Sequence, residues 1–263
     1  MKEFYEAYYE LVDHSPVHHD FCEKIFGRDL AQHGFADMEQ LELLIQHAGL
    51  EPQTQALDLG CGNGMIAEYL SDRTEACITG IDYIPAAIRA AQTRTAEKSD
   101  RLRFQVGDIN RLELPLRFFD VIMLIDTIYF SDDYTRTIRE LKAALRPNGR
   151  LAIFFSYGRE PHIAPEEFPK DRLPPDKTPL AEALQKNAMP FDTWDLTKLD
   201  YRNSRQRKEL LPQLKTQFER ESAMFIYENR LGEANCICQS IEDGIHKRYL
   251  YIAADHNMTM EKS

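Results

Sequence analysis

The sequence lacks the features that mark membrane and disulfide-stabilised secreted proteins. No apolar run approaches the length of a membrane span, and no apolar core flanked by basic residues follows Met1. We therefore expect a cytoplasmic protein with no membrane partner. The chain has only five cysteines, an odd and scattered set that excludes a disulfide framework. Cys236 and Cys238 have no His or Cys partners at ligand spacing, so we expect no metal there.

Positive charge is also scarce. The chain has 32 Lys and Arg against 43 Asp and Glu, a formal net charge of -11, and no basic stripe of any length. Because phosphate backbones are bound by such stripes, this excludes a nucleic acid as the main substrate and favours a small molecule. Nothing in the sequence indicates an oligomeric state. The 263 residues suffice for one well-buried α/β domain with an appended region.

The most informative stretch is residues 56–64, Ala-Leu-Asp-Leu-Gly-Cys-Gly-Asn-Gly. An apolar strand runs into three glycines at alternate positions, from Gly60 to Gly64, and a helical pattern begins near Met65. Glycine suits such a turn because a ligand lying across the strand's end must touch bare backbone. A carboxylate in this apolar strand, Asp58, is costly to bury without partners, so we expect it to face backbone amides or a cationic ligand.

The string from Asp58 to Gly64 resembles the first motif of class I S-adenosylmethionine-dependent methyltransferases, an acidic residue followed by x-Gly-x-Gly-x-Gly. The competing dinucleotide fingerprint, Gly-x-Gly-x-x-Gly, would need a glycine where Met65 stands. The resemblance covers residues 50–155 and implies S-adenosylmethionine as the cofactor. It also implies that the cofactor contacts Asp58, Gly60, Cys61 and Gly62.

Acidic residues also follow the next two predicted strands. Asp82 closes the second strand ~20 residues after the glycine turn, where a carboxylate accepts both ribose hydroxyl protons in nucleotide-binding folds. In the family that this sequence resembles, the matching acidic residue has that role, and Tyr83 is placed to cover adenine. The third strand ends near Asp108 and Ile109, to which the resemblance assigns the adenine amine and a ring nitrogen. An Asx turn closing the strand fits Asp108 equally well.

The fourth predicted strand, residues 119–125, is almost continuously apolar, as in a parallel strand covered on both faces. Residues 126–130 follow it and match the family's fourth motif, at the reaction edge. The repeated strand–helix units and the resemblance predict an α/β, Rossmann-like, seven-stranded and mostly parallel sheet with helices on both faces. N-terminal helices and a helical insertion are expected to form a cap on it.

Methyl transfer is an in-line displacement, so the protein mainly orients and desolvates two reactants. If the acceptor must lose a proton, the candidate bases are Asp126, His33 and Tyr129. Each has an alternative role: Asp126 can hold the cofactor's ammonium, which also makes it a cofactor-binding candidate, His33 can cap a helix, and Tyr129 can be a pocket wall.

The predicted function is S-adenosylmethionine-dependent methyl transfer to a small-molecule acceptor whose N, O, S or C nucleophile is undetermined. Two alternatives stay open from the sequence. A non-catalytic S-adenosylmethionine-binding module would keep the motif residues but lack a substrate cavity. A nicotinamide-dependent oxidoreductase would need the longer glycine spacing.

We divide the chain into an N-terminal helical lid segment (residues 1–49), a methyltransferase core (50–197 and 245–256) and a helical insertion that forms a cap (198–244). The first and last of these carry aromatic residues that are expected to roof the pocket: Tyr8, Tyr9, Phe35, Phe218, Phe225 and Tyr227.

Three of the eight histidines fall within residues 14–19, between two predicted short helices. A zinc site there would need further ligands at tetrahedral spacing, and none is present. We expect a polar, partly exposed hinge.

Overall fold

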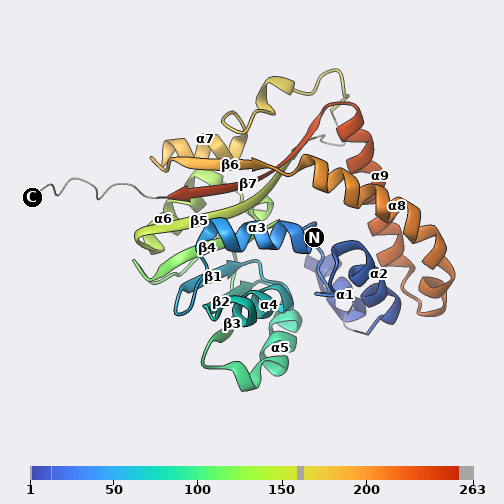
Figure 1. Ribbon diagram of the computed structural model, residues 1–263, viewed down its shortest axis with the longest axis horizontal. Coiled ribbons are helices and arrows are strands. Elements are labelled where there is room, and N and C mark those ends of the chain that lie inside the picture. The colour runs from blue at the N-terminus through green and yellow to red at the C-terminus, as the bar shows by residue number, and fades with distance from the viewer. Residues whose placement is uncertain (1, 13, 159–162, 255–263) are drawn as a thin grey trace, which may run out of the picture.

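A seven-stranded sheet in the order β3-β2-β1-β4-β5-β7-β6 organises the computed structural model, which describes residues 2–12, 14–158 and 163–254 (Figure 1). The strands are β1 (Gln55–Leu59), β2 (Cys77–Asp82), β3 (Leu102–Val106), β4 (Phe119–Ile125), β5 (Leu145–Gly158), β6 (Phe191–Asp195) and β7 (His246–Ala254). The first five pair in parallel, whereas β7 runs antiparallel to both β5 and β6. The predicted Rossmann-like, mostly parallel sheet is confirmed.

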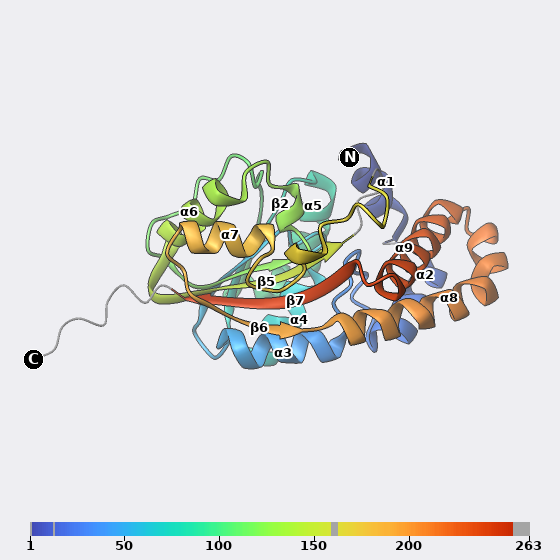
Figure 2. The same ribbon diagram turned by 90° about the horizontal axis from the view of Figure 1, so that it is seen from above.

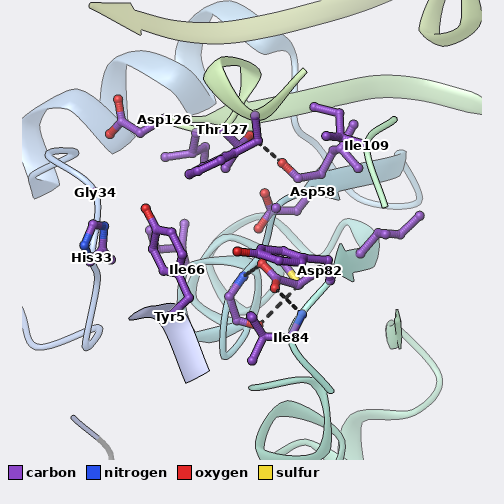
Figure 3. Close-up of a pocket in the computed structure, with 18 of the residues that line it drawn as sticks. Tyr5, His33, Gly34, Asp58, Ile66, Asp82, Ile84, Ile109, Asp126 and Thr127 are labelled. Atoms are coloured by element: carbon purple, nitrogen blue, oxygen red, sulfur yellow. Dashed lines mark hydrogen bonds between the residues drawn. The ribbon is translucent and has the colours of Figure 1, made fainter. Parts of the chain in front are cut away.

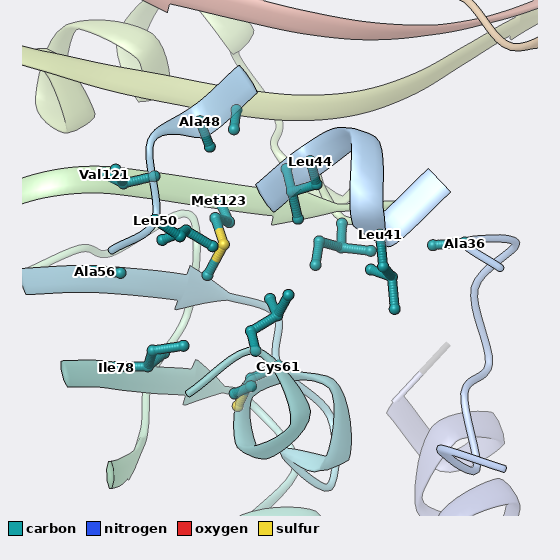
Figure 4. Packing of buried hydrophobic residues seen from close by; sticks show 14 of the residues in the cluster. Ala36, Leu41, Leu44, Ala48, Leu50, Ala56, Cys61, Ile78, Val121 and Met123 are labelled. Atoms are coloured by element: carbon teal, nitrogen blue, oxygen red, sulfur yellow. The ribbon is translucent and has the colours of Figure 1, made fainter. Parts of the chain in front are cut away.

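Helices cover both faces of this sheet. The five helices of the core are α3 (Met38–Ala48), α4 (Met65–Thr74), α5 (Pro85–Arg94), α6 (Tyr134–Ala144) and α7 (Pro179–Lys186). Leu41 and Leu44 of α3 pack with residues of α4 and α5 against one face (Figure 4). On the other face, Leu141 of α6 and Leu180 of α7 pack against the strands. Figure 2 shows α3 on the opposite side of the sheet from α6 and α7.

Four further helices form a cap beside the sheet: α1 (Lys2–Val12), α2 (Pro16–Phe26), α8 (Thr197–Arg220) and α9 (Met224–Glu242). Both ends of the chain contribute to one buried apolar cluster, in which Phe21 of α2 and Phe218 of α8 are fully buried. The N-terminal helices and the insertion, which the sequence suggests as separate regions, therefore pack together as one unit. Figure 1 shows α1 and α2 beside α8 and α9.

The predicted polar, partly exposed hinge is confined to the exposed turn at His14, whereas His18 and His19 lie within α2. Ser15 caps α2 by accepting from the backbone amide of His18, and Pro16 occupies the first turn, where its missing amide costs nothing. The side chain of His18 is fully buried, and its Nε2 lies 3.1 Å from the hydroxyl of Tyr8. Ser15 and Pro16 therefore start α2 ahead of His18 and His19 and leave His14 outside the helix.

Within the described residues, two features of membrane and metal-binding proteins are absent. None of the helices there is long and apolar enough to cross a membrane. In the same part of the chain, no group of three or more His, Cys, Asp or Glu side chains is placed to hold a metal ion.

Candidate functional site

The glycine turn after β1 leaves no space for side chains. Gly60 and Gly62 have φ values of +84° and +56°, in the left-handed region that favours glycine. A Cβ at Gly60 would lie 2.3 Å from Thr127, and one at Gly62 would lie 2.3 Å from the hydroxyl of Tyr9 in α1. The amide of Gly60 donates to the carbonyl of Ile81 at 2.6 Å, which ties the turn to β2. Bare backbone therefore faces the space above the strands.

That space is a cavity of about 600 Å³ at the carboxyl ends of the central strands (Figure 3). All of the residues that the sequence suggests for the cofactor line it: Asp58, Gly60, Cys61, Gly62, Asp82, Tyr83, Asp108, Ile109 and Asp126. His33 and Tyr129, the other two candidate bases, line it as well. The structure thus brings together every predicted site residue.

Backbone amides hold the Asp82 carboxylate in place. It accepts from the amide of Gly62 at 2.9 Å and from that of Ile84 at 2.9 Å, and only 7% of the residue is exposed. Burial raises the pKa of Asp82, and the two amide hydrogen bonds oppose that shift. The carboxylate is oriented but keeps lone pairs that can accept from hydroxyl groups of a ligand.

Asp58 has a different environment. It is 2% exposed and lines the cavity, and no hydrogen bond from a described residue reaches its carboxylate. Burial, and secondarily the nearby Asp82 carboxylate, raises the pKa of Asp58 to about 7. The sequence predicts either backbone amides or a cationic ligand as the partner of Asp58. No backbone amide of a described residue donates to its carboxylate. A cationic ligand group is the partner that remains.

Asp108 closes β3 with the Asx turn that the sequence left open as an alternative. Its Oδ1 accepts from the amide of Asn110 at 2.8 Å. The side chain of Asn110 in turn donates to the carbonyl of Phe130 at 2.8 Å and accepts from the amide of Asp132 at 2.8 Å. These bonds fix the loop after β3 against the segment after β4, so that Ile109 becomes part of the cavity wall.

Asp126 forms a buried ion pair that the sequence does not suggest. Its two carboxylate oxygens lie 2.5 and 3.0 Å from the guanidinium nitrogens of Arg248 in β7, which is fully buried. The amide of Phe35 donates to the same carboxylate at 2.8 Å. Asp126 itself has a φ of +59°. A carboxylate with this bidentate partner is a structural anchor between β4, β7 and the segment before α3.

Tyr129 lines the cavity, and its hydroxyl is engaged by the backbone of β5. The hydroxyl accepts from the amide of Ser156, and the ring stacks on Phe155 with centroids 5.4 Å apart. Burial, followed by the neighbouring Asp126 carboxylate, raises the pKa of Tyr129 above its usual range. These contacts favour the pocket-wall role over that of a base.

His33 has an unengaged ring nitrogen. Its Nε2 is enclosed and has no hydrogen-bond partner among the described residues, and Oε1 of Glu233 in α9 lies 4.0 Å away. Burial, together with the positive charges of Arg230 and Arg207, lowers the pKa of His33 well below its usual value. The imidazole is therefore neutral near pH 7.

Arginine and aromatic side chains hold the segment that carries His33. Arg230 donates to the carbonyls of Gln32 and His33 and to the hydroxyl of Tyr8. The rings of Tyr5 and Tyr8 meet the His33 ring edge-on, with centroids 5.0 and 4.7 Å away. The ring is thereby held at the cavity wall.

The sequence misses three contributors to the site: Tyr5, Glu233 and Arg248. Tyr5 and Glu233 line the cavity, and Arg248 anchors Asp126 from behind. Of these three, only Arg248 could have been recognised from the sequence around it, because it is a charged residue near the start of an apolar strand. Of the aromatics expected to roof the pocket, Tyr9 and Phe35 line it, whereas others belong to the cap interior: Tyr8, Phe218 and Tyr227. Phe225 is 38% exposed and does not line the cavity.

Comparison with protein families and curated sequences agrees with this geometry. The methyltransferase domain family matches residues 56–149. The 27-O-demethylrifamycin SV methyltransferase of Amycolatopsis mediterranei is 30% identical over 146 residues, which cover 51% of this chain and 53% of that protein. Phosphoethanolamine N-methyltransferase 1 of Arabidopsis thaliana is 30% identical over 146 residues, which cover 56% of this chain and 29% of that protein. The chain thus spans about half the length, or less, of these curated relatives.

Solved structures show the same fold. Haemonchus contortus phosphoethanolamine N-methyltransferase 2, in complex with phosphomonomethylethanolamine and S-adenosylhomocysteine, superposes with a TM-score of 0.74 at 19% identity, covering 90% of this chain and 56% of that one. The cyclopropane synthase MmaA2 of Mycobacterium tuberculosis superposes with a TM-score of 0.71 at 17% identity, covering 97% and 98% of the two chains. Residues 56–149 therefore match a methyltransferase domain, and they lie within a fold that the chain shares with these solved structures.

Proposed function

We propose that this chain transfers a methyl group from S-adenosylmethionine to a small-molecule acceptor. The observation that carries the proposal is that the motif residues and the cap line one and the same cavity of about 600 Å³. A non-catalytic module that only binds the cofactor needs the motif residues but no additional cavity wall from the cap. Calorimetry of S-adenosylmethionine binding, followed by detection of S-adenosylhomocysteine in the presence of small amines, phenols, acids and thiols, tests it.

The residues present fit this cofactor. Asp82 is placed to accept from the ribose hydroxyls, and Asp58 offers its unpartnered carboxylate to the ammonium of the methionine part. Tyr83 and Ile109 provide apolar walls for adenine, and Asp108 adds a carboxylate at its edge. When bound, the cofactor supplies an activated methyl group on a sulfonium, so the chain's own task is to orient the acceptor and exclude water.

His33 is the proposed base among the three candidates. Asp126 is committed to Arg248, and the hydroxyl of Tyr129 is committed to Ser156. His33 lines the cavity, is neutral near pH 7 and has an enclosed Nε2 without a hydrogen-bond partner among the described residues, so it can accept a proton once a ligand reaches that atom. Asp126 and Tyr129 then position the surrounding wall.

The cap is proposed to act as the lid. Tyr5 and Tyr9 of α1 reach into the cavity, and the hydroxyl of Tyr9 lies against the glycine turn at Gly62. A helix in this place excludes water from a charged methyl donor. Because α1 shares its apolar cluster with α8 and α9, the lid comprises both parts of the cap, residues 2–26 and 197–242.

An Asp82→Ala variant is expected to bind S-adenosylmethionine about 1.5–3 kcal/mol more weakly, roughly a 10- to 150-fold loss, because the ribose hydroxyls lose a charged acceptor. Calorimetry on the folded variant measures the loss. Asp192→Ala, at an exposed position of β6, is the control and should bind as the unmodified protein does. Unchanged affinity in Asp82→Ala would remove this residue from the cofactor site.

The affinity for S-adenosylmethionine is expected to fall as the pH drops below about 7. The pKa of Asp58 is raised to about 7, so below that pH the free protein carries a neutral carboxyl, which must lose its proton to pair with the ammonium. Dissociation constants measured between pH 5.5 and 8.5 should rise towards acid and level off towards base. An Asp58→Asn variant should bind weakly and show much less pH dependence. An equally steep slope in that variant would assign the titration to another group.

A further inference from the structure

The charged side chains that line the cavity are all carboxylates. Among the residues that the structure describes, they are Asp58, Asp82, Asp108, Asp126, Asp132 and Glu233, and neither lysine nor arginine joins them. Asp58 and Asp82 belong to the proposed cofactor end. Another part of the lining, which we take as the acceptor end, comprises Tyr5, His33, Phe35, Phe130 and Glu233, and the ring of Tyr5 contacts those of His33 and Phe130. A ligand in that end meets aromatic rings, a neutral imidazole and a carboxylate.

Three arginines lie near this end without lining the cavity, and Nε and Nη1 of Arg207 have no hydrogen-bond partner among the described residues. Arg248 pairs with Asp126, and Arg230 binds backbone carbonyls before α3 and lies 3.4 Å from Glu233. The guanidinium of Arg207 lies over the Phe35 ring, 4.9 Å from its centroid. All three arginines are 0% exposed. Because the cavity lining contains carboxylates but no lysine or arginine, an acceptor with a phosphate or carboxylate group would meet no cation in that lining, which is unfavourable.

The pair formed by His33 and Glu233 matches a different ligand. Nε2 of His33 and Oε1 of Glu233 lie 4.0 Å apart with no hydrogen bond between them. When Nε2 is unprotonated both atoms are acceptors, and a single ammonium nitrogen can bridge this spacing with two N–H bonds of about 2.9 Å each. A hydroxyl has one proton and can satisfy only one of the two. The surrounding rings add cation–π attraction for a positive charge.

We propose that the acceptor is a small amine without a phosphate or carboxylate substituent, held by Glu233 and the aromatic walls with its nitrogen against His33. This rests on the proposed methyl transfer. His33 takes one proton from the bound ammonium, which frees the nitrogen's lone pair. The nitrogen then forms the N–C bond to the methyl group as the C–S bond breaks. The products are the methylated ammonium, a neutral thioether and a proton on His33 that passes to solvent.

Matched ligands test the charge preference on the unmodified protein. S-adenosylhomocysteine-loaded protein is titrated with ethanolamine and phosphoethanolamine, and with phenethylamine and 3-phenylpropanoate, while the thermal midpoint is followed. The amines without an anionic group should give saturable stabilisation with at least tenfold lower dissociation constants than their anionic partners. Equal or tighter binding of the anions, or no saturable binding of either amine, overturns the proposal. Failure to bind S-adenosylhomocysteine at all would instead refute the proposed function.

A substitution in the cap tests whether Glu233 causes the preference for amines over anions. Glu233→Gln should weaken binding of the better amine at least tenfold while S-adenosylhomocysteine affinity changes less than twofold. Glu228→Gln, at an exposed position of the same helix, is the matched control and should bind both as the unmodified protein does. Because Glu233 also faces Arg207 and Arg230, circular dichroism must confirm the fold of the variant. Unchanged amine affinity in a folded Glu233→Gln protein would overturn the role of Glu233.

Discussion

An Asp126→Asn variant is expected to lose about 3–5 kcal/mol of unfolding free energy, because the buried guanidinium of Arg248 loses the carboxylate hydrogen-bonded to it and keeps only the longer-range attraction of Asp200. Asp126 is the only described residue whose carboxylate forms a hydrogen bond with Arg248, at 2.5 and 3.0 Å, and Arg248 is 0% exposed. The loss should appear in guanidinium chloride denaturation as a lower midpoint with an unchanged slope. Turnover should fall in parallel, because Phe35 and the segment carrying His33 lose their anchor.

The strand that precedes Asp126 provides a matched control. Asp120, near the start of β4, also pairs with an arginine, Arg146 at 2.9 Å, but 37% of its side chain is exposed, against 6% for Asp126. Asp120→Asn should therefore cost no more than about 1 kcal/mol. If Asp126→Asn were equally mild while turnover collapsed, Asp126 would be a chemical participant, and the base role that the sequence left open would be favoured over the anchor.

The sequence predicts the core and the cofactor half of the site well because both depend on short contiguous patterns. An apolar strand, a glycine turn and a helix follow one another within residues 56–74, and each needs only local geometry. Asp82 and Asp108 follow later strands of the same sheet. Since the carboxyl ends of parallel strands meet at one edge, order along the chain translates directly into proximity in space.

The acceptor half could not be predicted in the same way, because its contacts join segments far apart in the chain. Asp126 and Arg248 are 122 residues apart in the sequence. Glu233 of α9 and His33, which precedes α3, are likewise far apart in the sequence but lie 4.0 Å from each other. Helical spacing shows that α1 has aromatic residues but not which of them faces the cavity. Tyr9 does so, whereas its neighbour Tyr8 packs into the cap, because α8 and α9 cover that side.

Replacing His33 by glutamine is expected to lower turnover by roughly 10²- to 10⁴-fold, the usual contribution of a positioned proton acceptor. Stability should change little, since Nε2 of His33 makes no hydrogen bond with a described residue that the substitution would break. S-adenosylhomocysteine affinity should stay within twofold, because the proposed cofactor contacts lie on other residues. Single-turnover kinetics together with calorimetry separate these quantities.

The control is His18, a fully buried histidine in α2 of the cap. His18 also has a pKa that burial lowers, but its Nε2 lies within hydrogen-bonding distance of Tyr8, at 3.1 Å, and it does not line the cavity. His18→Gln should therefore cost stability and leave the methyl-transfer step nearly intact at temperatures where the protein is folded. The opposite pattern, with His18→Gln inactive and His33→Gln active, would remove the base from His33.

The pH profile distinguishes a base from a residue that only shapes the cavity. Because burial lowers the pKa of His33, its neutral form persists below the ordinary histidine value of about 6.5, and kcat/KM should fall only when the pH drops through the lowered pKa. Protonation also opposes folding, since the unfolded chain binds the proton at a higher pH than the folded one does, so stability declines as the pH falls below about 6.5. In His33→Gln the acid limb of kcat/KM should disappear. An identical acid limb in the variant would show that another group carries the titration and that His33 is part of the wall.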